Sequence, residues 1–180
     1  MADTRTRRFT SAPATLPLYA KAVLPGLPVL GLLPAVRHSG SSAPDLVMVR
    51  DNVRTDTGHL ADYAGVCGLR VADTLPATYP HLAAFGLQLA LMTEPAFPFA
   101  PMGTVHVGNT ITQYRPLHVR EGYDVRVHAQ DLRPHPKGRL IDLVSAASVD
   151  GVLAYVSAAY PAAASLSPRR RRMYASTRSP

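Results

Sequence analysis

The clearest pattern in the chain is a run of apolar residues with helical spacing between positions 79 and 93. Leu82, Phe85, Leu89 and Met92 recur at steps of three and four residues, which is the spacing of one face of an α-helix. Other leucines widen this stripe until almost every face of the helix is apolar. Because such a helix has no face suited to water, the pattern predicts a long helix buried inside the protein.

The residues after this helix alternate between apolar and polar side chains, which is the pattern of β-strands. The Asp150-Gly151 pair is a two-residue hairpin signal between the last two of these segments. Hairpin-linked strands run antiparallel, so the pattern predicts an α+β fold in which an antiparallel sheet wraps around the helix. The predicted strands cover residues 105–114, 123–132, 139–149 and 152–160.

The segment before the helix divides into two parts. Residues 1–44 contain several prolines and a Ser/Gly patch, which predict an irregular N-terminal arm. An ordered domain over residues 45–160 then begins with a strand at Leu46, and Asp56 is placed to cap a short helix that ends at Gly65 or Gly68. Residues 161–180 are predicted to form a basic disordered tail.

The formal net charge of +7 is confined to the two ends of the chain. Outside residues 1–8 and 165–180 the numbers of basic and acidic residues are equal, so the body offers no basic surface for nucleic acid or membrane. We expect both ends to be dispensable for folding. The Arg169–Arg172 run either is a solvated tail or binds a phosphate such as that of coenzyme A.

Two further features bear on the compartment. The single cysteine, Cys67, excludes a disulfide within the chain and fits a reducing environment. The most apolar stretch, residues 22–36, is shorter than the roughly 20 residues that a membrane-spanning helix needs, and it contains three prolines. These features predict a cytoplasmic protein.

Several short motifs follow one another along the chain in a consistent order and spacing. Together they resemble the N-terminal hotdog half of actinobacterial double-hotdog MaoC-like dehydratases, which are enoyl-thioester hydratases, over roughly residues 17–155. The motifs are Asp73-Thr74-Leu75-Pro76-Ala77-Thr78-Tyr79-Pro80-His81, Leu91-Met92-Thr93, Phe97-Pro98-Phe99, Met102-Gly103-Thr104-Val105-His106, Gln113-Tyr114-Arg115-Pro116-Leu117, Leu132-Arg133-Pro134-His135, Lys137-Gly138 and Asp142-Leu143-Val144.

The resemblance implies a division of labour between two hotdogs. In that family the second hotdog carries Gly-Asp-x-Asn-Pro-x-His, whose Asp and His transfer protons during reversible hydration of a trans-2-enoyl thioester. The first hotdog mainly houses the acyl chain. In this sequence no Asp or Glu has a His five residues later, and Gly-Asp does not occur. We therefore predict an acyl-thioester-binding hotdog without the catalytic pair, and whether the chain is itself an enzyme stays open.

The resemblance also indicates where substrate would bind, although each position has a simpler structural explanation. The residues at the start of the helix also suit an ordinary helix N-terminus, and the apolar residues after it also suit the core. His106 and Asn109 have opposite parity on one strand, so they cannot both point inward. The candidate substrate-binding residues are Tyr79, Pro80, His81, Phe97, Phe99, Met102, His106 and Asn109.

Other chemistries find no support in the sequence. It has no Gly-x-Ser-x-Gly, no His-Glu-x-x-His, no paired cysteines and no phosphate loop, so no metal or cofactor is expected beside a coenzyme A or acyl-carrier thioester substrate. A hotdog thioesterase would place an acidic residue near the central helix, where this chain has only Gln88. The expected partner is a second hotdog, and the alternative is a non-catalytic homodimer that binds an acyl group or serves a structural role.

Overall fold

The computed structural model describes residues 5–23, 38, 40–136 and 138–164 of the 180-residue chain. Three helices and six strands occur in this part of the chain. In order they are β1 (Arg5–Phe9), α1 (Thr15–Val23), β2 (Leu46–Val53), α2 (Thr57–Cys67), α3 (Tyr79–Met92), β3 (Thr104–Gln113), β4 (Tyr123–His135), β5 (Gly138–Val149) and β6 (Val152–Ala164).

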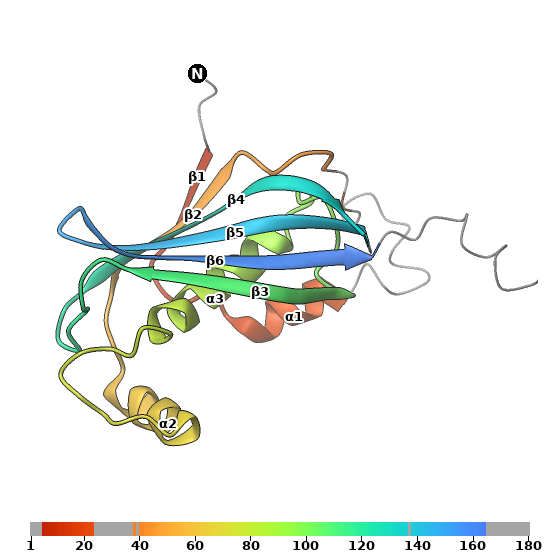
Figure 1. Cartoon of the computed structure of the whole chain (residues 1–180). Helices are drawn as coiled ribbons and strands as arrows, with labels where there is room; N and C mark the ends of the chain where they lie inside the picture. Colours follow the sequence, from red (N-terminus) through yellow and green to blue (C-terminus); the bar gives the residue numbers. More distant parts are fainter. Residues whose placement is uncertain (1–4, 24–37, 39, 137, 165–180) are drawn as a thin grey trace, which may run out of the picture.

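The six strands form one curved sheet in the order β1-β2-β4-β5-β6-β3. All neighbours pair antiparallel except β1 and β2, which run parallel. Helix α3 lies along one face of the sheet and packs against β2, β4 and β5 (Figure 1). This sheet around a central helix confirms the predicted α+β hotdog architecture.

Helix α3 matches the predicted segment to within one residue. Pro80 lies in the first turn, where the missing amide hydrogen leaves no hydrogen bond unmade. Leu87 and Leu91 are fully buried against the sheet. However, Leu82 and Phe85 are 40% and 41% exposed, which differs from the expectation of a helix buried on all sides. The sheet covers only one face of α3, so these two side chains remain in the open.

The predicted strands are confirmed, and the hairpin between β5 and β6 has the expected geometry. Asp150 and Gly151 both have positive φ, at 50° and 78°, as a type I′ turn requires, and Val149 pairs with Val152. Strand β6 continues to Ala164, so residues 161–164 belong to the sheet and not to a tail. The strand continues because its pairing continues: Ala162 pairs with Leu140 on β5 and with Val105 on β3. Residues 165–180 lie outside the described part of the chain.

The expectation of an irregular N-terminal arm is wrong for two segments. Strand β1 pairs with β2, and the arginines predicted to be dispensable bind acidic partners in the domain: Arg7 contacts Glu94 at 2.6 Å, and Arg8 contacts Asp51. Helix α1 forms despite Pro17, because a proline is tolerated in the first helical turn. Both elements depend on contacts with distant residues, which local sequence patterns do not reveal.

Helix α2 begins and ends as the sequence predicts. The Asp56 carboxylate accepts hydrogen bonds from the backbone amides of Gly58 and His59 at 2.8 and 3.1 Å, and Gly68 ends the helix with a φ of 66°. The helix projects from the body of the protein (Figure 1), and Val66 near its end is 90% exposed.

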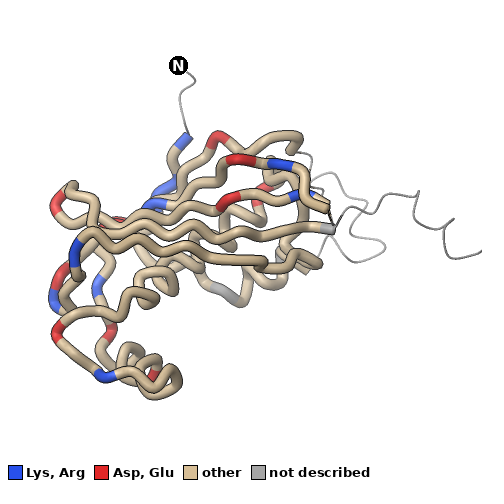
Figure 2. Tube along the Cα trace, viewed as in Figure 1, with Lys and Arg blue, Asp and Glu red and all other residues tan. Residues whose placement is uncertain are grey.

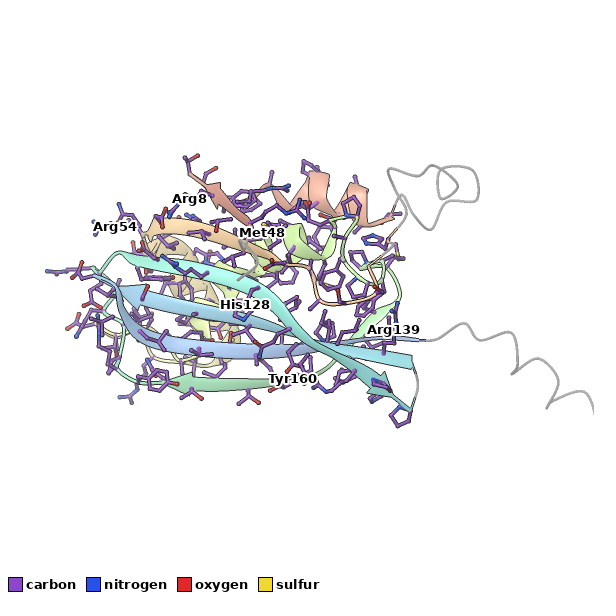
Figure 3. The ribbon with its side chains drawn as sticks, turned by 90° about the horizontal axis from the view of Figure 1, so that it is seen from above. Arg8, Met48, Arg54, His128, Arg139 and Tyr160 are labelled. Atoms are coloured by element: carbon purple, nitrogen blue, oxygen red, sulfur yellow. The ribbon has the colours of Figure 1, made fainter. Side chains whose placement is uncertain are left out.

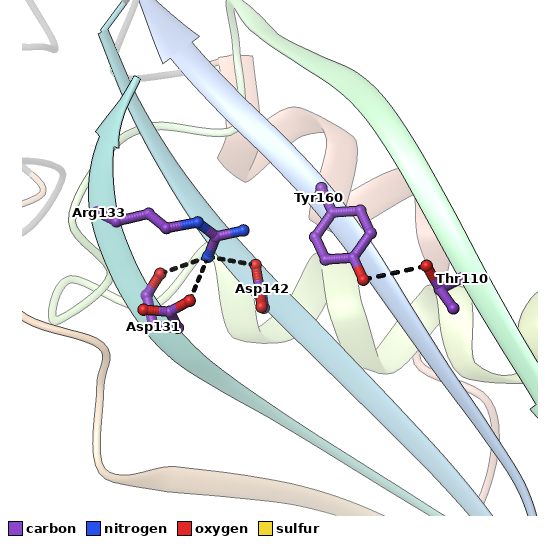
Figure 4. A network of polar contacts seen from close by, with 5 residues as sticks. All are labelled: Thr110, Asp131, Arg133, Asp142 and Tyr160. Carbon is purple, nitrogen blue, oxygen red and sulfur yellow. Dashed lines mark hydrogen bonds and ion pairs between the residues drawn. The ribbon is translucent and has the colours of Figure 1, made fainter.

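A polar network fastens the outer face of the sheet. One guanidinium nitrogen of Arg133 donates to Asp131 and to Asp142, at 2.7 and 2.6 Å, where the β4–β5 register shifts (Figure 4). The Tyr160 hydroxyl donates to Thr110 Oγ1 at 3.1 Å and joins β6 to β3. Seen from above, the labelled Tyr160 and His128 lie over this face (Figure 3), which faces away from α3.

Charged residues are interspersed over the described part of the chain and form no continuous stripe of one sign (Figure 2). This distribution agrees with the neutral body inferred from the sequence. None of the helices in the described residues is long and apolar enough to cross a membrane.

Candidate functional site

A cavity of about 470 Å³ lies between α1, α3 and the concave face of the sheet. Its wall is mostly apolar and includes residues from both helices, from the loop before β3, and from three strands. The lining residues are Tyr19, Ala22, Val23, His81, Phe85, Gln88, Leu89, Met92, Pro101, Met102, Gly103, Thr104, His106, Leu143, Ala159 and Pro161.

Three of the eight candidate residues line this cavity. His81 reaches it from the first turn of α3, Met102 from the loop before β3, and His106 from β3 itself. Asn109, which follows a register shift in the pairing of β3 with β6, is exposed and does not line it. The parity argument that His106 and Asn109 cannot both point inward is wrong, because the register shift pairs them with Pro161 and Ala159, which lie on the same face of β6.

The other four candidates form part of the core. Tyr79 and Pro80 are buried at the start of α3, and Phe97 and Phe99 pack edge to face with ring centres 5.2 Å apart. None of the four contributes to the cavity wall. Tyr79 and Pro80 therefore form the start of a helix, and Phe97 and Phe99 belong to the hydrophobic core.

Two polar pairs join α3 to the sheet below the cavity. His81 Nδ1 lies 3.1 Å from Ser157 Oγ, and Gln88 Nε2 donates to Ser145 Oγ at 2.9 Å. Burial lowers the pKa of His81 below its ordinary value of 6.5, and the nearby His106 lowers it further. Both effects favour the neutral imidazole, which can donate or accept a hydrogen bond without carrying charge.

Several residues of this site were not expected from the sequence. Gln88 was noted only because it stands where a thioesterase would carry an acidic residue, and no binding role was predicted for it. Ser145 and Ser157 could have been found, because each is a small polar residue at an inward-facing position of an alternating strand. Tyr19 and Ala22 could not, since α1 was not predicted.

A cluster of aromatic residues stabilises the junction of α2 and α3. The imidazole of His59 and the hydroxyl of Tyr79 lie within 2.9 Å, and the Tyr63 ring packs edge-on against Tyr79. Burial raises the pKa of Tyr79, and the Asp56 carboxylate adds to this effect. Beneath them, burial raises the pKa of Tyr123 to about 12. None of these side chains lines the cavity, and the contacts of His59 and Tyr63 with Tyr79 join α2 to α3.

Hollows also occur elsewhere in the described part of the chain, and the two described next contain no candidate residue. One, of about 480 Å³, lies beside β1 around the Arg7–Glu94 ion pair. The other, of about 610 Å³, lies between α2 and the segment 118–120. Within the described part of the chain, no three His, Cys, Asp or Glu side chains gather in a way that could hold a metal ion.

No family model matches the chain, but comparison with individual proteins is informative. The chain is 40% identical over 125 residues to 3-hydroxyacyl-thioester dehydratase X of Mycobacterium tuberculosis, and the match covers 69% of this chain. The chain belongs to the MaoC-like hotdog dehydratases. The MaoC-like resemblance inferred from the sequence motifs is thereby confirmed.

Solved structures agree with this assignment to the MaoC-like dehydratases. The crystal structure of HtdX of Mycobacterium tuberculosis matches with a TM-score of 0.63 and 38% identity, covering 66% of this chain and 51% of that chain. A truncated HadBC complex, a 3R-hydroxyacyl-ACP dehydratase of the same organism, matches with a TM-score of 0.52 at 12% identity, covering 62% of this chain and 89% of that chain, and so shares the fold.

In both the curated dehydratase and the HtdX structure, the match covers a smaller share of the relative than of this chain. The chain corresponds to 44% of the curated dehydratase and 51% of the HtdX chain, so it spans about half the length of these MaoC-like relatives.

Proposed function

We propose that this chain is the acyl-thioester-binding hotdog of a 3-hydroxyacyl-thioester dehydratase, and that hydration of the enoyl thioester requires a second hotdog supplying the Asp/His pair. The observation that carries the proposal is the apolar cavity beside α3, in a chain 40% identical to a 3-hydroxyacyl-thioester dehydratase. The substrate would be a coenzyme A or acyl-carrier thioester. We place the protein in the cytoplasm, in keeping with its single unpaired cysteine.

The size and lining of the cavity suit an acyl chain. Its volume of about 470 Å³ falls in the range of protein sites for small molecules. Each methylene transferred from water to an apolar wall contributes about 0.8 kcal/mol, so a medium-length chain gains several kcal/mol before the cost of immobilising it. Leu89, Met92 and Leu143 supply much of that wall.

The same cavity lacks the groups for the chemical step. Adding water across a conjugated thioester requires a base for the water and an acid at the α-carbon, each worth about 10²–10⁴-fold. The titratable side chains along the described cavity wall are Tyr19, His81 and His106. None of the residues along this described wall is an Asp or Glu. We infer that these histidines contact substrate and that proton transfer falls to the second hotdog.

An exposed apolar region beside the cavity supports pairing with that second hotdog. Leu82 and Phe85 on α3 are open to solvent, as are Met102, Val105 and Val107 in and before β3. Strand β3 is also an edge of the sheet, whose free backbone groups favour pairing with another strand. The HadBC structure is likewise a complex of hotdog dehydratase subunits.

Binding of decanoyl-coenzyme A to the purified chain, measured by isothermal titration calorimetry, tests the proposal. Met92→Trp places a larger side chain in the cavity and should weaken binding at least tenfold, whereas Val66→Trp on the exposed end of α2 should leave it unchanged. Equal binding by both variants would show that the acyl chain lies elsewhere.

Reconstitution separates the proposal from its alternative. Co-expression with a hotdog that carries Gly-Asp-x-Asn-Pro-x-His should restore hydration of crotonyl-coenzyme A. A chain that binds acyl groups as a homodimer, forms no such pair and supports no turnover would instead be a non-catalytic acyl-binding hotdog.

A further inference from the structure

Helix α1 supplies part of the wall of the cavity. It lies beside α3 on the concave side of the sheet (Figure 1), and its residues Tyr19, Ala22 and Val23 line the cavity. Ala22 and Val23 follow Tyr19 by three and four residues, so the three side chains share one face of the helix. Ala22 is buried, whereas Ala20 on the opposite face is exposed. One face of α1 therefore covers the cavity.

A glycine on α3 lets the chain before α1 approach closely. A Cβ atom added at Gly86 would lie 3.3 Å from Cδ of Pro13 and 3.5 Å from the Pro13 carbonyl oxygen. Glycine inside a helix is otherwise less favourable than alanine, because it loses more backbone freedom on folding. Gly86 is not among the residues that line the cavity. It positions α1 against α3 from outside the cavity wall.

Helix α1 is too short to be stable by itself. Isolated helices of fewer than about 12 residues are marginal in water, and α1 has nine. Its position depends on the Pro13 contact, on Leu18, which packs against the core, and on what fills the cavity beneath Ala22. A ligand that packs against α1 therefore stabilises the helix, and the docked helix in turn strengthens binding of that ligand.

The part of the wall that α3 contributes is polar at one end and apolar at the other. His81, with its contact to Ser157, lies in the first turn, whereas Leu89 and Met92 lie in the last two turns. A thioester group is polar and its acyl chain is apolar, so the thioester suits the His81 end and the chain extends toward Met92.

The contact between Pro13 and Gly86 falls part-way along this path. At 1.5 Å per residue, Gly86 lies about 8 Å and Met92 about 16 Å from His81 along the helix axis. An extended carbon chain advances about 1.2 Å per bond, so a six-carbon acyl group spans about 6 Å and a ten-carbon group about 11 Å. The shorter group therefore ends before the level of Gly86, and the longer group passes it.

We propose that α1 sets the acyl-chain length that the cavity prefers: Tyr19, Ala22 and Val23 contact the methylenes beyond about the sixth carbon, and Gly86 is the positioning residue for α1. This inference rests on the proposed function, because it concerns the acyl group in the same cavity. It assigns the choice of chain length to a helix outside the sheet and the central helix.

Calorimetric titration with hexanoyl- and decanoyl-coenzyme A tests the inference. Each buried methylene is worth about fourfold in affinity, so the unaltered chain should bind the decanoyl thioester at least about tenfold more tightly after the cost of immobilising the chain. Ala22→Phe fills the space beneath α1 and should remove most of this preference, with hexanoyl binding unchanged. Ala20→Phe is the matched control on the exposed face of the same helix and should retain the preference.

Gly86→Leu tests the positioning role. The new side chain displaces Pro13, and α1 with it, without changing a residue of the cavity wall, so it should also reduce the preference for decanoyl. Gly65→Leu is its control, because a Cβ atom at this helical glycine on α2 meets nothing within 4 Å. A preference that survives Gly86→Leu would overturn the role given to Gly86.

Hydrogen exchange gives a readout that cavity filling alone would not move. Amide exchange over residues 15–23 should slow when decanoyl-coenzyme A is added and should not slow with hexanoyl-coenzyme A. Equal affinity for the two thioesters, a preference that survives Ala22→Phe, or α1 exchange that decanoyl-coenzyme A leaves unchanged would each overturn the inference. Failure of the unaltered chain to bind either thioester would overturn the proposed function itself.

Discussion

The imidazole of His59 lies 2.9 Å from the hydroxyl of Tyr79, a contact that ties α2 to the first turn of α3. The Tyr63 hydroxyl adds a second tie, 2.5 Å from Thr78 Oγ1. Apart from these contacts, α2 buries only Leu60 and Ala64. The position of α2 therefore depends on a small number of side chains.

Tyr79→Phe should loosen α2 while leaving the sheet intact. Loss of the hydroxyl removes one hydrogen bond of a half-buried pair, which costs about 1 kcal/mol of unfolding free energy. Amide hydrogen exchange should become faster over residues 57–67 than over β5. Tyr114→Phe, at a position 62% exposed, should change neither quantity. Unchanged exchange in α2 would mean that its position is fixed by other contacts.

The protein should lose stability between pH 10 and 12 because of Tyr123. In the unfolded chain this phenol ionises at its ordinary pKa of 10.0, whereas burial raises its pKa in the fold to about 12. Above pH 10 the unfolded state therefore releases a proton that the folded state keeps. The free energy of unfolding should fall by about 2 kcal/mol across this interval, measured by urea denaturation at each pH.

Tyr123→Phe provides the comparison for that measurement. The Tyr123 hydroxyl is buried and makes no hydrogen bond within the described structure, so its removal should be neutral or stabilising at pH 7. The variant should also show a smaller loss of stability above pH 10. A variant that is clearly destabilised at pH 7 would reveal a partner for this hydroxyl.

Leu87→Ala should be among the most destabilising single changes in α3. Leu87 is fully buried between the helix and the sheet, and truncation of such a leucine costs about 2–5 kcal/mol. Val66→Ala, at a side chain 90% exposed, should change the unfolding free energy by less than about 0.5 kcal/mol. Chemical denaturation of the two variants side by side measures the difference. Similar values would contradict the assignment of α3 as the centre of the core.

Association should depend on the β3 edge strand and not on the β5–β6 hairpin. We expect the purified chain to be a dimer or larger, and Val107→Lys, at a residue 50% exposed on this edge strand, should shift it toward the monomer in native mass spectrometry. Val152→Lys at the β5–β6 hairpin is similarly exposed, at 65%, and should leave association unchanged. A stable monomer of the unaltered chain at micromolar concentration would remove this prediction.

The elements that could be predicted from sequence are those with strong local signals. Helix α3 has a helical apolar repeat, α2 has Asp56 and Gly68 at its ends, and the β5–β6 hairpin has Asp150-Gly151. In each case the residues that define the element are neighbours in sequence. Strand β1 and helix α1 lack such signals, since β1 is stabilised by pairing with β2, about 40 residues away.

The candidate site was predictable only in part, for a similar reason. His81 and His106 were identified through their motifs, and both line the cavity. Phe97 and Phe99 carry the same apolar character as true lining residues, and sequence cannot say on which side of the core they lie. The wall formed by Tyr19 depends on how α1 docks against α3, a tertiary contact that no motif records.

Hydration of crotonyl-coenzyme A by the purified chain, followed by loss of the enoyl absorbance, tests the central claim most directly. A cavity without a carboxylate beside its histidines should give a rate no higher than background, and His81→Ala and His106→Ala should not alter it. Addition of a hotdog that carries the Asp/His motif should raise the rate. Robust hydration by the chain alone, abolished by His81→Ala or His106→Ala, would show that this cavity is a complete active site and would contradict the account.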